Sequence, residues 1–131
     1  EAYGMFLEGE ADLVLSYTTS PAYHLIAEGD ASKSFAVFDE GHYMQIEVAG
    51  KLASSDQSAL ADQFLQFMVS DVFQSIIPTT NWMFPAVTPA AGLPEGFPKA
   101  LSAKQSLIFS PTEAAALRNV ALVEWQTALS Q

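Results

Sequence analysis

The chain has 131 residues, of which 50% are hydrophobic and 15% are charged, so its composition is that of a globular domain. Its formal net charge is −10, which argues against nucleic acid as a partner because phosphate binding needs a basic face. The chain has no cysteine, which excludes disulfides and zinc–thiolate sites, and no apolar run approaches the ~18 residues of a membrane span.

The chain begins without an initiator methionine, only a short way before a predicted strand. We therefore expect it to be a fragment of a longer protein.

Residues 12–18, DLVLSYT, form a short apolar run that is typical of a buried strand. Ser20 and Pro21 predict the start of a short helix, because serine supplies a capping oxygen and proline fits the first helical position. Gly29 predicts its end.

Two further strands are predicted over residues 35–38 and 42–49, on either side of an Asp-Glu-Gly turn. The second alternates apolar and polar side chains, which indicates one face toward solvent. A strong amphipathic helix is predicted over residues 54–70, where Ser54 and Gln57 have the spacing of a capping box.

The second half of the chain predicts two more helices separated by a loop. Ser70 and Asp71 predict the start of a short helix that Pro78 ends. Residues 88–99 are rich in proline and glycine and predict a surface loop. The clearest helix follows over residues 110–130, where Ser110 caps it, Pro111 opens it and Glu113 completes a capping box. Strands that alternate with helices indicate an α/β fold with a mixed sheet flanked by helices.

Motifs for catalysis are scarce. The chain has no G-x-S-x-G elbow, no phosphate-binding glycine loop and no H-E-x-x-H pair. His24 and His42 are its two histidines, and a lone histidine on a helix or a strand is more often structural than a base. The carboxylates are scattered and form no pair suited to acid–base catalysis.

The turn YTTSP, between the first predicted strand and helix, is the best candidate for a ligand site. In open α/β sheets, ligands bind where a strand ends and the chain turns into a helix. Hydroxyls of Thr18, Thr19 and Ser20 could bond polar ligand atoms, and the helix amides could hold a phosphate. Tyr17 and Tyr23 flank the turn and could stack on a flat or cationic ligand. The alternative is that Ser20 only caps the helix and both tyrosines only pack.

The tryptophans have different expected roles. Trp82 lies in PTTNWMFP, a segment bounded by prolines, where an indole can close a ligand slot or fill a gap in the core. Trp125 lies on the apolar face of the last predicted helix, so core packing is its expected role.

Several segments resemble the carboxyl-terminal part of the periplasmic thiamine-binding proteins, the receptors of bacterial thiamine ABC importers. They are GEADLVLSYTTSPAYH at 9–24, EGHYMQIEVA at 40–49, FLQFMVS at 64–70, IPTTNWM at 77–83 and, more loosely, FSPTEAAALRNVALVEWQTALS at 109–130. The resemblance runs along essentially the whole chain, with a poor match between Thr88 and Ser106.

The resemblance implies part of a two-lobed type II periplasmic binding protein, with residues 1–131 as its carboxyl-terminal fragment and without the N-terminal lobe. It implies a periplasmic, non-enzymatic protein that binds thiamine and its phosphate esters, without a cofactor, and delivers them to a membrane permease. The full-length protein is expected to be monomeric and not to span the membrane. The ligand-contacting positions that it implies are Tyr17, Thr18, Thr19, Ser20, Tyr23 and Trp82.

Two alternatives stay open. Related receptors of similar fold bind ferric iron through adjacent tyrosines at the matching turn, but here Tyr17 is followed by two threonines. The other alternative is a small hydrolase that uses Ser20 and His24, although no motif supports it.

Overall fold

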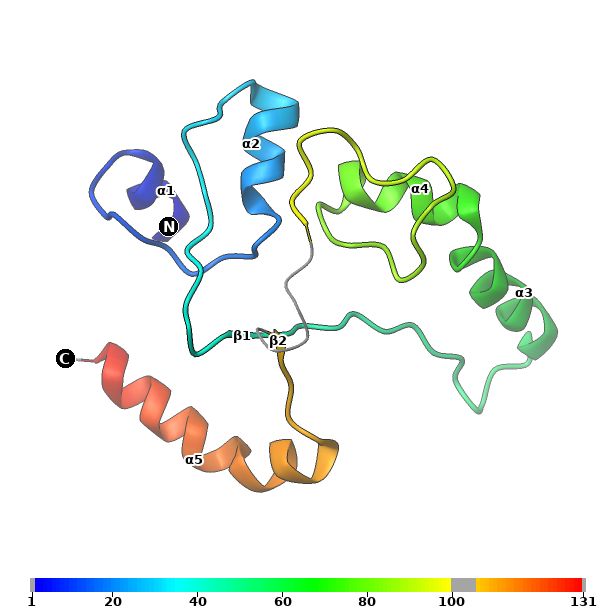
Figure 1. Cartoon of the computed structure of the whole chain (residues 1–131). Coiled ribbons are helices and arrows are strands. Elements are labelled where there is room, and N and C mark those ends of the chain that lie inside the picture. Colours follow the sequence, from blue (N-terminus) through cyan, green and yellow to red (C-terminus); the bar gives the residue numbers. More distant parts are fainter. Residues whose placement is uncertain (1, 100–105, 131) are drawn as a thin grey trace. The chain divides into compact units, whose positions relative to one another are not determined.

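The computed structural model describes residues 2–99 and 106–130. Its elements are α1 (Ala2–Leu7), α2 (Ser20–Glu28), β1 (His42–Tyr43), α3 (Ser58–Met68), α4 (Asp71–Thr80), β2 (Ser106–Leu107) and α5 (Pro111–Leu129) (Figure 1). The described residues divide into two compact units. The first contains residues 2–36 and 47–99, and the second contains residues 37–46 and 106–130.

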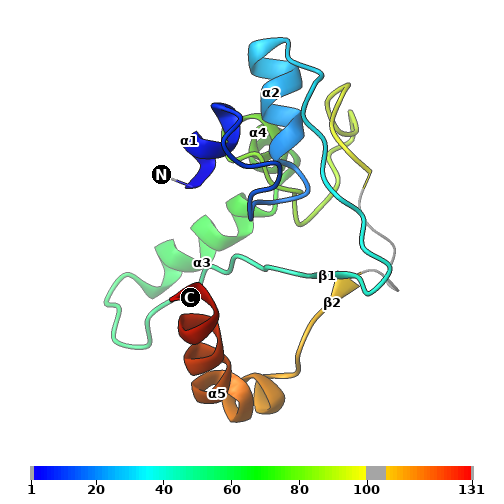
Figure 2. The ribbon, with the colours of Figure 1, turned by 90° about the vertical axis from the view of Figure 1, so that its left-hand side faces the viewer.

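The first unit contains the helices α1 to α4. Figure 2 shows α1 beside α2. The rings of Tyr3 on α1 and His24 on α2 lie nearly parallel, with a centroid distance of 5.9 Å. Helix α3 packs against α4 through an edge contact between Phe67 and Phe73, whose centroids are 5.5 Å apart. Aromatic contacts of this kind hold the helix pairs together within the unit.

The second unit combines a small parallel sheet with α5. In the sheet, His42 pairs with Ser106 and Tyr43 pairs with Leu107. Helix α5 begins as predicted, because the Ser110 hydroxyl accepts a hydrogen bond from the Glu113 amide and the Glu113 carboxylate accepts one from the Ser110 amide. The fold therefore combines helices with a small parallel sheet, which agrees with the predicted α/β class.

Most of the predicted strand residues are not in strands. Residues 12–18 and 35–38 lack regular structure, and of residues 42–49 only His42 and Tyr43 belong to a strand. The Leu15 side chain is 94% exposed, so the first apolar run is not buried either. A strand is defined by hydrogen bonds to a neighbouring strand, and the described residues offer such a neighbour only to β1 and β2.

The predicted helices exist, but several of their boundaries differ. Helix α3 begins at Ser58, and the capping box of Ser54 and Gln57 does not form, because the Gln57 amide donates to the Ser55 hydroxyl at 3.2 Å. Helix α4 begins at the predicted cap, Ser70, whose hydroxyl accepts from the Phe73 amide. A short helix at the start of the chain, α1, was not predicted.

Helix α4 does not end at Pro78 but runs through it to Thr80. Proline removes one backbone donor, so a helix normally stops or kinks there. Here the proline ring is fully buried, and the helical hydrogen-bond pattern continues across it, because the Asn81 amide donates to the Ile77 carbonyl. Burial of the proline ring offsets the lost hydrogen bond.

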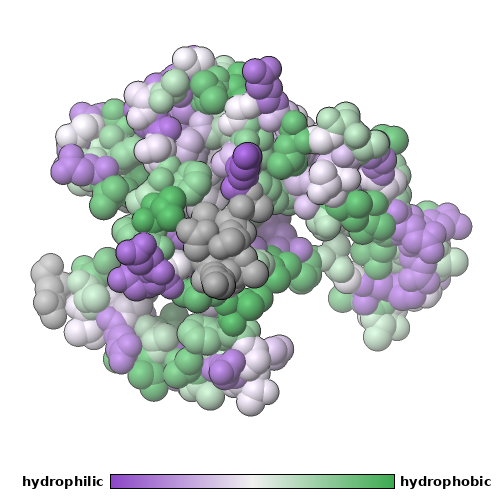
Figure 3. Space-filling model, in the orientation of Figure 1, coloured by the Kyte–Doolittle hydropathy of each residue, from purple (hydrophilic) through white to green (hydrophobic). Residues whose placement is uncertain are grey.

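Few of the described side chains are fully enclosed, and large hydrophobic side chains lie at the surface of both units (Figure 3). Trp125 is an example: it is 59% exposed, so the prediction that it packs in the core is wrong. The second unit has only α5 and two very short strands, which leaves the indole without a facing layer among the described residues. Each unit therefore encloses only a small core.

Candidate functional site

The YTTSP turn leads directly into α2, but Ser20 does not cap the helix as predicted. Ser20 is the first helical residue, Pro21 is the second, and Thr19 is the cap residue without a side-chain capping bond. The Ser20 hydroxyl instead bonds back to the Ser16 hydroxyl at 2.7 Å and accepts from the Tyr17 amide at 3.3 Å. These bonds tie the turn to the segment before it, rather than to the helix amides ahead.

The turn presents one buried hydroxyl and one exposed ring. Thr19 is 2% exposed, and its Oγ1 has no hydrogen-bond partner among the described residues. A buried hydroxyl without a partner costs free energy. Tyr17 lies about half exposed, and Thr18 is partly exposed. The turn can therefore offer a phenol ring to a ligand.

Tyr23 and Trp82 form a ring pair. Their centroids are 5.2 Å apart with an interplanar angle of 83°, the edge-to-face arrangement that aromatic rings favour. Tyr23 is 39% exposed and Trp82 is partly exposed, so the pair is not sealed in a core. Two residues far apart in the sequence thus form one aromatic surface that faces solvent.

Trp82 has a φ of 55°, in the left-handed region. A bulky residue there is strained, by about 1–3 kcal/mol, and such strain persists only where the surroundings enforce it. The sequence carries no sign of this conformation, because glycine or asparagine would be the usual residue at such a position. The backbone therefore places the indole against Tyr23 at an energetic cost.

The loop that follows Trp82 is held by two side chains of α4. Gln74 is 6% exposed; its Nε2 donates to the Met68 carbonyl at 2.6 Å, and its Oε1 accepts from the Val87 amide at 3.2 Å. Asp71 Oδ1 accepts from the Ala90 amide at 2.6 Å. These bonds hold the loop in place beyond the indole.

The same loop contacts the C-terminal half of α2 through Gly96. Gly96 has a φ of 86°, and a Cβ atom on it would lie 2.9 Å from Leu25 Cδ2. Only glycine allows both this conformation and this close approach. The contact brings the loop that begins with Trp82 against the helix that carries Tyr23.

His24 lies behind the ring pair and is almost completely buried. Its Nε2 is 2.7 Å from the Tyr3 hydroxyl, and its Nδ1 is 2.7 Å from Glu28 Oε2. Its ring also meets the edge of Tyr23, with centroids 5.2 Å apart. Both ring nitrogens of His24 thus bond elsewhere than to Ser20, and the Ser20 hydroxyl bonds to Ser16. This geometry does not favour the hydrolase alternative, which needs a Ser20–His24 contact.

Hydrogen bonds and charge around Glu28 shift two pKa values. Hydrogen bonds from His24 and Tyr23 lower the pKa of Glu28. The hydrogen bond to Glu28, together with its negative charge, raises the pKa of Tyr23. Glu28 is therefore ionised at neutral pH, whereas Tyr23 keeps its proton.

The predicted site residues lie in two groups of the first unit. Tyr17, Thr18, Thr19 and Ser20 form the turn. Tyr23 lies less than one helical turn farther along α2 and pairs with Trp82, which follows α4. Sequence reasoning missed two residues behind the pair, Tyr3 and Glu28. The four-residue spacing of His24 and Glu28 on a helix could have indicated their contact. No local pattern links Tyr3 to His24.

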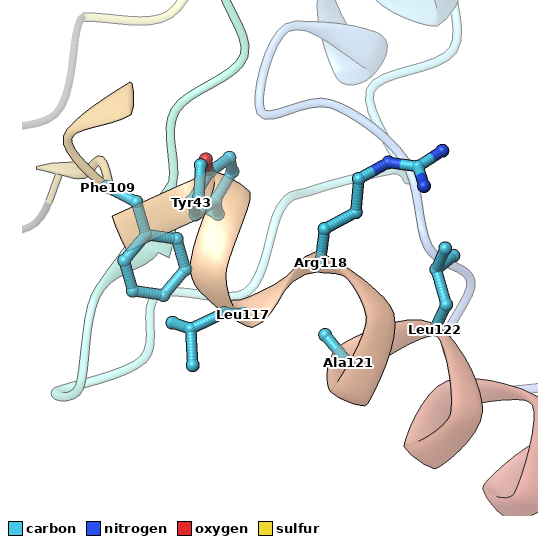
Figure 4. A pocket seen from close by; sticks show the side chains of 7 residues that line it. Tyr43, Phe109, Leu117, Arg118, Ala121 and Leu122 are labelled. Carbon is cyan, nitrogen blue, oxygen red and sulfur yellow. The ribbon is translucent and has the colours of Figure 1, made fainter. Parts of the chain in front are cut away.

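The second unit has an apolar pocket against α5 (Figure 4). Its lining consists of Tyr43, Phe109, Ala114, Leu117, Arg118, Ala121 and Leu122. None of the predicted site residues lies in it. Residues 2–99 and 106–130 contain no group of three or more His, Asp or Glu side chains that could hold a metal ion. Within the same ranges, no helix has the length and apolarity needed to cross a membrane.

No family model matches the chain. Curated relatives nevertheless match all 131 residues. The chain is 53% identical to the thiamine-binding periplasmic protein of Escherichia coli (strain K12), 52% to that of Salmonella typhimurium (strain LT2) and 43% to that of Brucella melitensis biotype 1. The chain spans 39% of the length of each of these relatives.

A solved structure of a periplasmic thiamin binding protein matches 99% of this chain with a TM-score of 0.84 and 53% sequence identity, and the match covers 40% of that structure. The resemblance found in the sequence is thus confirmed: the chain is homologous to thiamine-binding periplasmic proteins along its whole length. The ferric-iron alternative gains no support, because all of these relatives are named for thiamine.

Proposed function

We propose that this chain is the carboxyl-terminal part of a periplasmic receptor that binds thiamine and its phosphate esters and delivers them to the permease of an ABC importer. The observation that carries this proposal is homology along the whole chain to proteins named for thiamine binding, at up to 53% identity. The receptor has two lobes, closes around its ligand and acts as a monomer.

The ring pair suits the chemistry of this ligand. Thiamine has a cationic thiazolium ring and a flat aminopyrimidine, and both can stack on aromatic side chains or make cation–π contacts. Tyr23 and Trp82 offer such a surface, because both rings are partly exposed and are held edge to face. The net charge of −10 does not repel a cation.

The turn before α2 suits the other end of the ligand. The exposed phenol of Tyr17 and the hydroxyls of Thr18, Thr19 and Ser20 can bond the hydroxyethyl arm or its phosphate. The unpartnered Oγ1 of Thr19 supports a polar group at this point. The receptor binds without transforming its ligand and needs no cofactor. The other walls of the cleft belong to the remaining part of the receptor, so this chain alone should bind weakly.

The proposal is tested by calorimetric titration of the complete receptor with thiamine. Trp82→Ala should weaken binding by roughly 1–3 kcal/mol, the scale for losing a stacked or cation–π contact. Trp125→Ala is the matched control, because it removes an exposed indole from the other unit, and it should leave affinity unchanged. A wild-type receptor that shows no heat of binding would refute the function. Equal affinity of the wild type and Trp82→Ala would refute this site.

A further inference from the structure

We propose that His24 is a positioning residue for the ligand site, which holds the Tyr23–Trp82 pair in place through hydrogen bonds to Tyr3 and Glu28 without touching the ligand itself. The inference rests on the proposed function, since its effect is read as affinity for thiamine.

The two hydrogen bonds of His24 fix both the position and the tautomer of its ring. Glu28 is ionised and can only accept, so Nδ1 of His24 carries the proton. In the neutral ring, Nε2 then accepts from the Tyr3 hydroxyl, 2.7 Å away. The ring of Tyr3 lies nearly parallel to the imidazole, with an interplanar angle of 5°. The imidazole is therefore held at both nitrogens.

The held imidazole is connected to the ring pair in two ways. The edge contact of His24 with Tyr23 places the phenol between the imidazole and the indole of Trp82. Glu28 also acts on Tyr23, because the interaction with its carboxylate raises the pKa of the phenol. One carboxylate thus ties the buried histidine and the exposed tyrosine together. A shift of His24 would move Tyr23 and with it the surface that Trp82 completes.

A purely packing role would not require this chemistry. Burying a polar ring costs free energy unless its nitrogens are satisfied, whereas a phenylalanine would fill a similar volume without that cost. A fully bonded polar network specifies one orientation, and apolar packing does not. His24 is 2% exposed with both nitrogens bonded, so the site has the features of an orienting network.

The test is a double-variant cycle on thiamine affinity in the complete receptor. His24→Phe should weaken binding about tenfold, the scale of coupling between residues in contact. In a Tyr23→Ala background the same change should have no further effect, because the ring that His24 positions is gone. His42→Phe is the matched control, since it removes a hydrogen-bonded histidine from the other unit, and it should leave affinity unchanged.

The outcomes separate the two proposals. If the wild-type receptor does not bind thiamine, the proposed function fails. If it binds, and His24→Phe stays within twofold of it or adds fully to Tyr23→Ala, the positioning role is overturned. Should His24→Phe not fold, Tyr3→Phe enters the same cycle, because it removes the hydroxyl that bonds His24 and keeps the ring beside it. A loss of affinity that disappears in the Tyr23→Ala background supports the proposal, and an additive or absent loss refutes it.

Discussion

Gln74 offers the sharpest test of how the loop beyond Trp82 is held. Gln74→Glu changes little in shape, and the remaining oxygen can still accept from the Val87 amide. The other side-chain atom changes from a donor to an acceptor, 2.6 Å from the Met68 carbonyl oxygen. At neutral pH this places an ionised carboxylate in a site that is 6% exposed, against an oxygen that it cannot bond.

The magnitude follows from the pKa of the introduced carboxyl group. In the unfolded chain the pKa of this group is about 4.3, whereas burial and the Met68 carbonyl oxygen raise its pKa in the folded protein. A rise of about two units, moderate for a buried carboxyl, corresponds to about 3 kcal/mol. Below the unfolded pKa the group is protonated in both states and can donate to Met68. The penalty therefore appears as the pH rises through the unfolded pKa, and it is complete above the folded pKa.

Urea denaturation at pH 7 and pH 4 measures this difference. We expect Gln74→Glu to be about 3 kcal/mol less stable than the wild type at pH 7, with most of that loss removed at pH 4. Gln66→Glu is the matched control, because Gln66 is exposed on α3, and it should follow the wild type at both pH values. A Gln74→Glu variant whose deficit is the same at pH 4 and pH 7 would show that the side chain is not buried against Met68.

Two further predictions concern the loop and the end of α2. Gly96→Ala and Gly92→Ala both place a side chain at positive φ, but only the first also meets Leu25, so Gly96→Ala should be about 1 kcal/mol less stable than Gly92→Ala in denaturant titration. Adding Leu25→Ala to both should remove that difference, and a difference that persists would contradict the contact. Hydrogen bonds from Ser32 lower the pKa of Asp30 to about 2, so the stability that Asp30 contributes is present above about pH 4 and is lost toward pH 2. In an acid titration Asp30→Asn should show a shallower fall across that window, and curves of equal slope would contradict the assignment.

The sequence predicted the helices better than their exact boundaries. The caps at Ser70 and Ser110 and the end of α2 at Gly29 all form as predicted. Each of these signals depends on residues within about four positions, so local chemistry decides them. The prediction that α4 ends at Pro78 was wrong because the burial of the proline ring, which allows the helix to continue, is a tertiary effect.

The strand predictions failed because a strand depends on residues that are distant in the sequence. An apolar run such as residues 12–18 has strand propensity, but a strand exists only where another backbone supplies hydrogen bonds. Among the described residues, that condition is met where His42 and Tyr43 pair with Ser106 and Leu107. Sequence periodicity carries no information on which partner is present.

For this protein, the sequence by itself determined the caps of α4 and α5 and the motifs that connect it to thiamine-binding proteins, because both depend on neighbouring residues. Only the tertiary structure decided that Trp82 meets Tyr23, that Trp82 has a positive φ, and that Tyr3 bonds the buried His24. These features join residues that are 21 or more positions apart, or depend on surroundings that enforce strain. Contacts at that separation arise from the packing of whole elements, which no local pattern specifies.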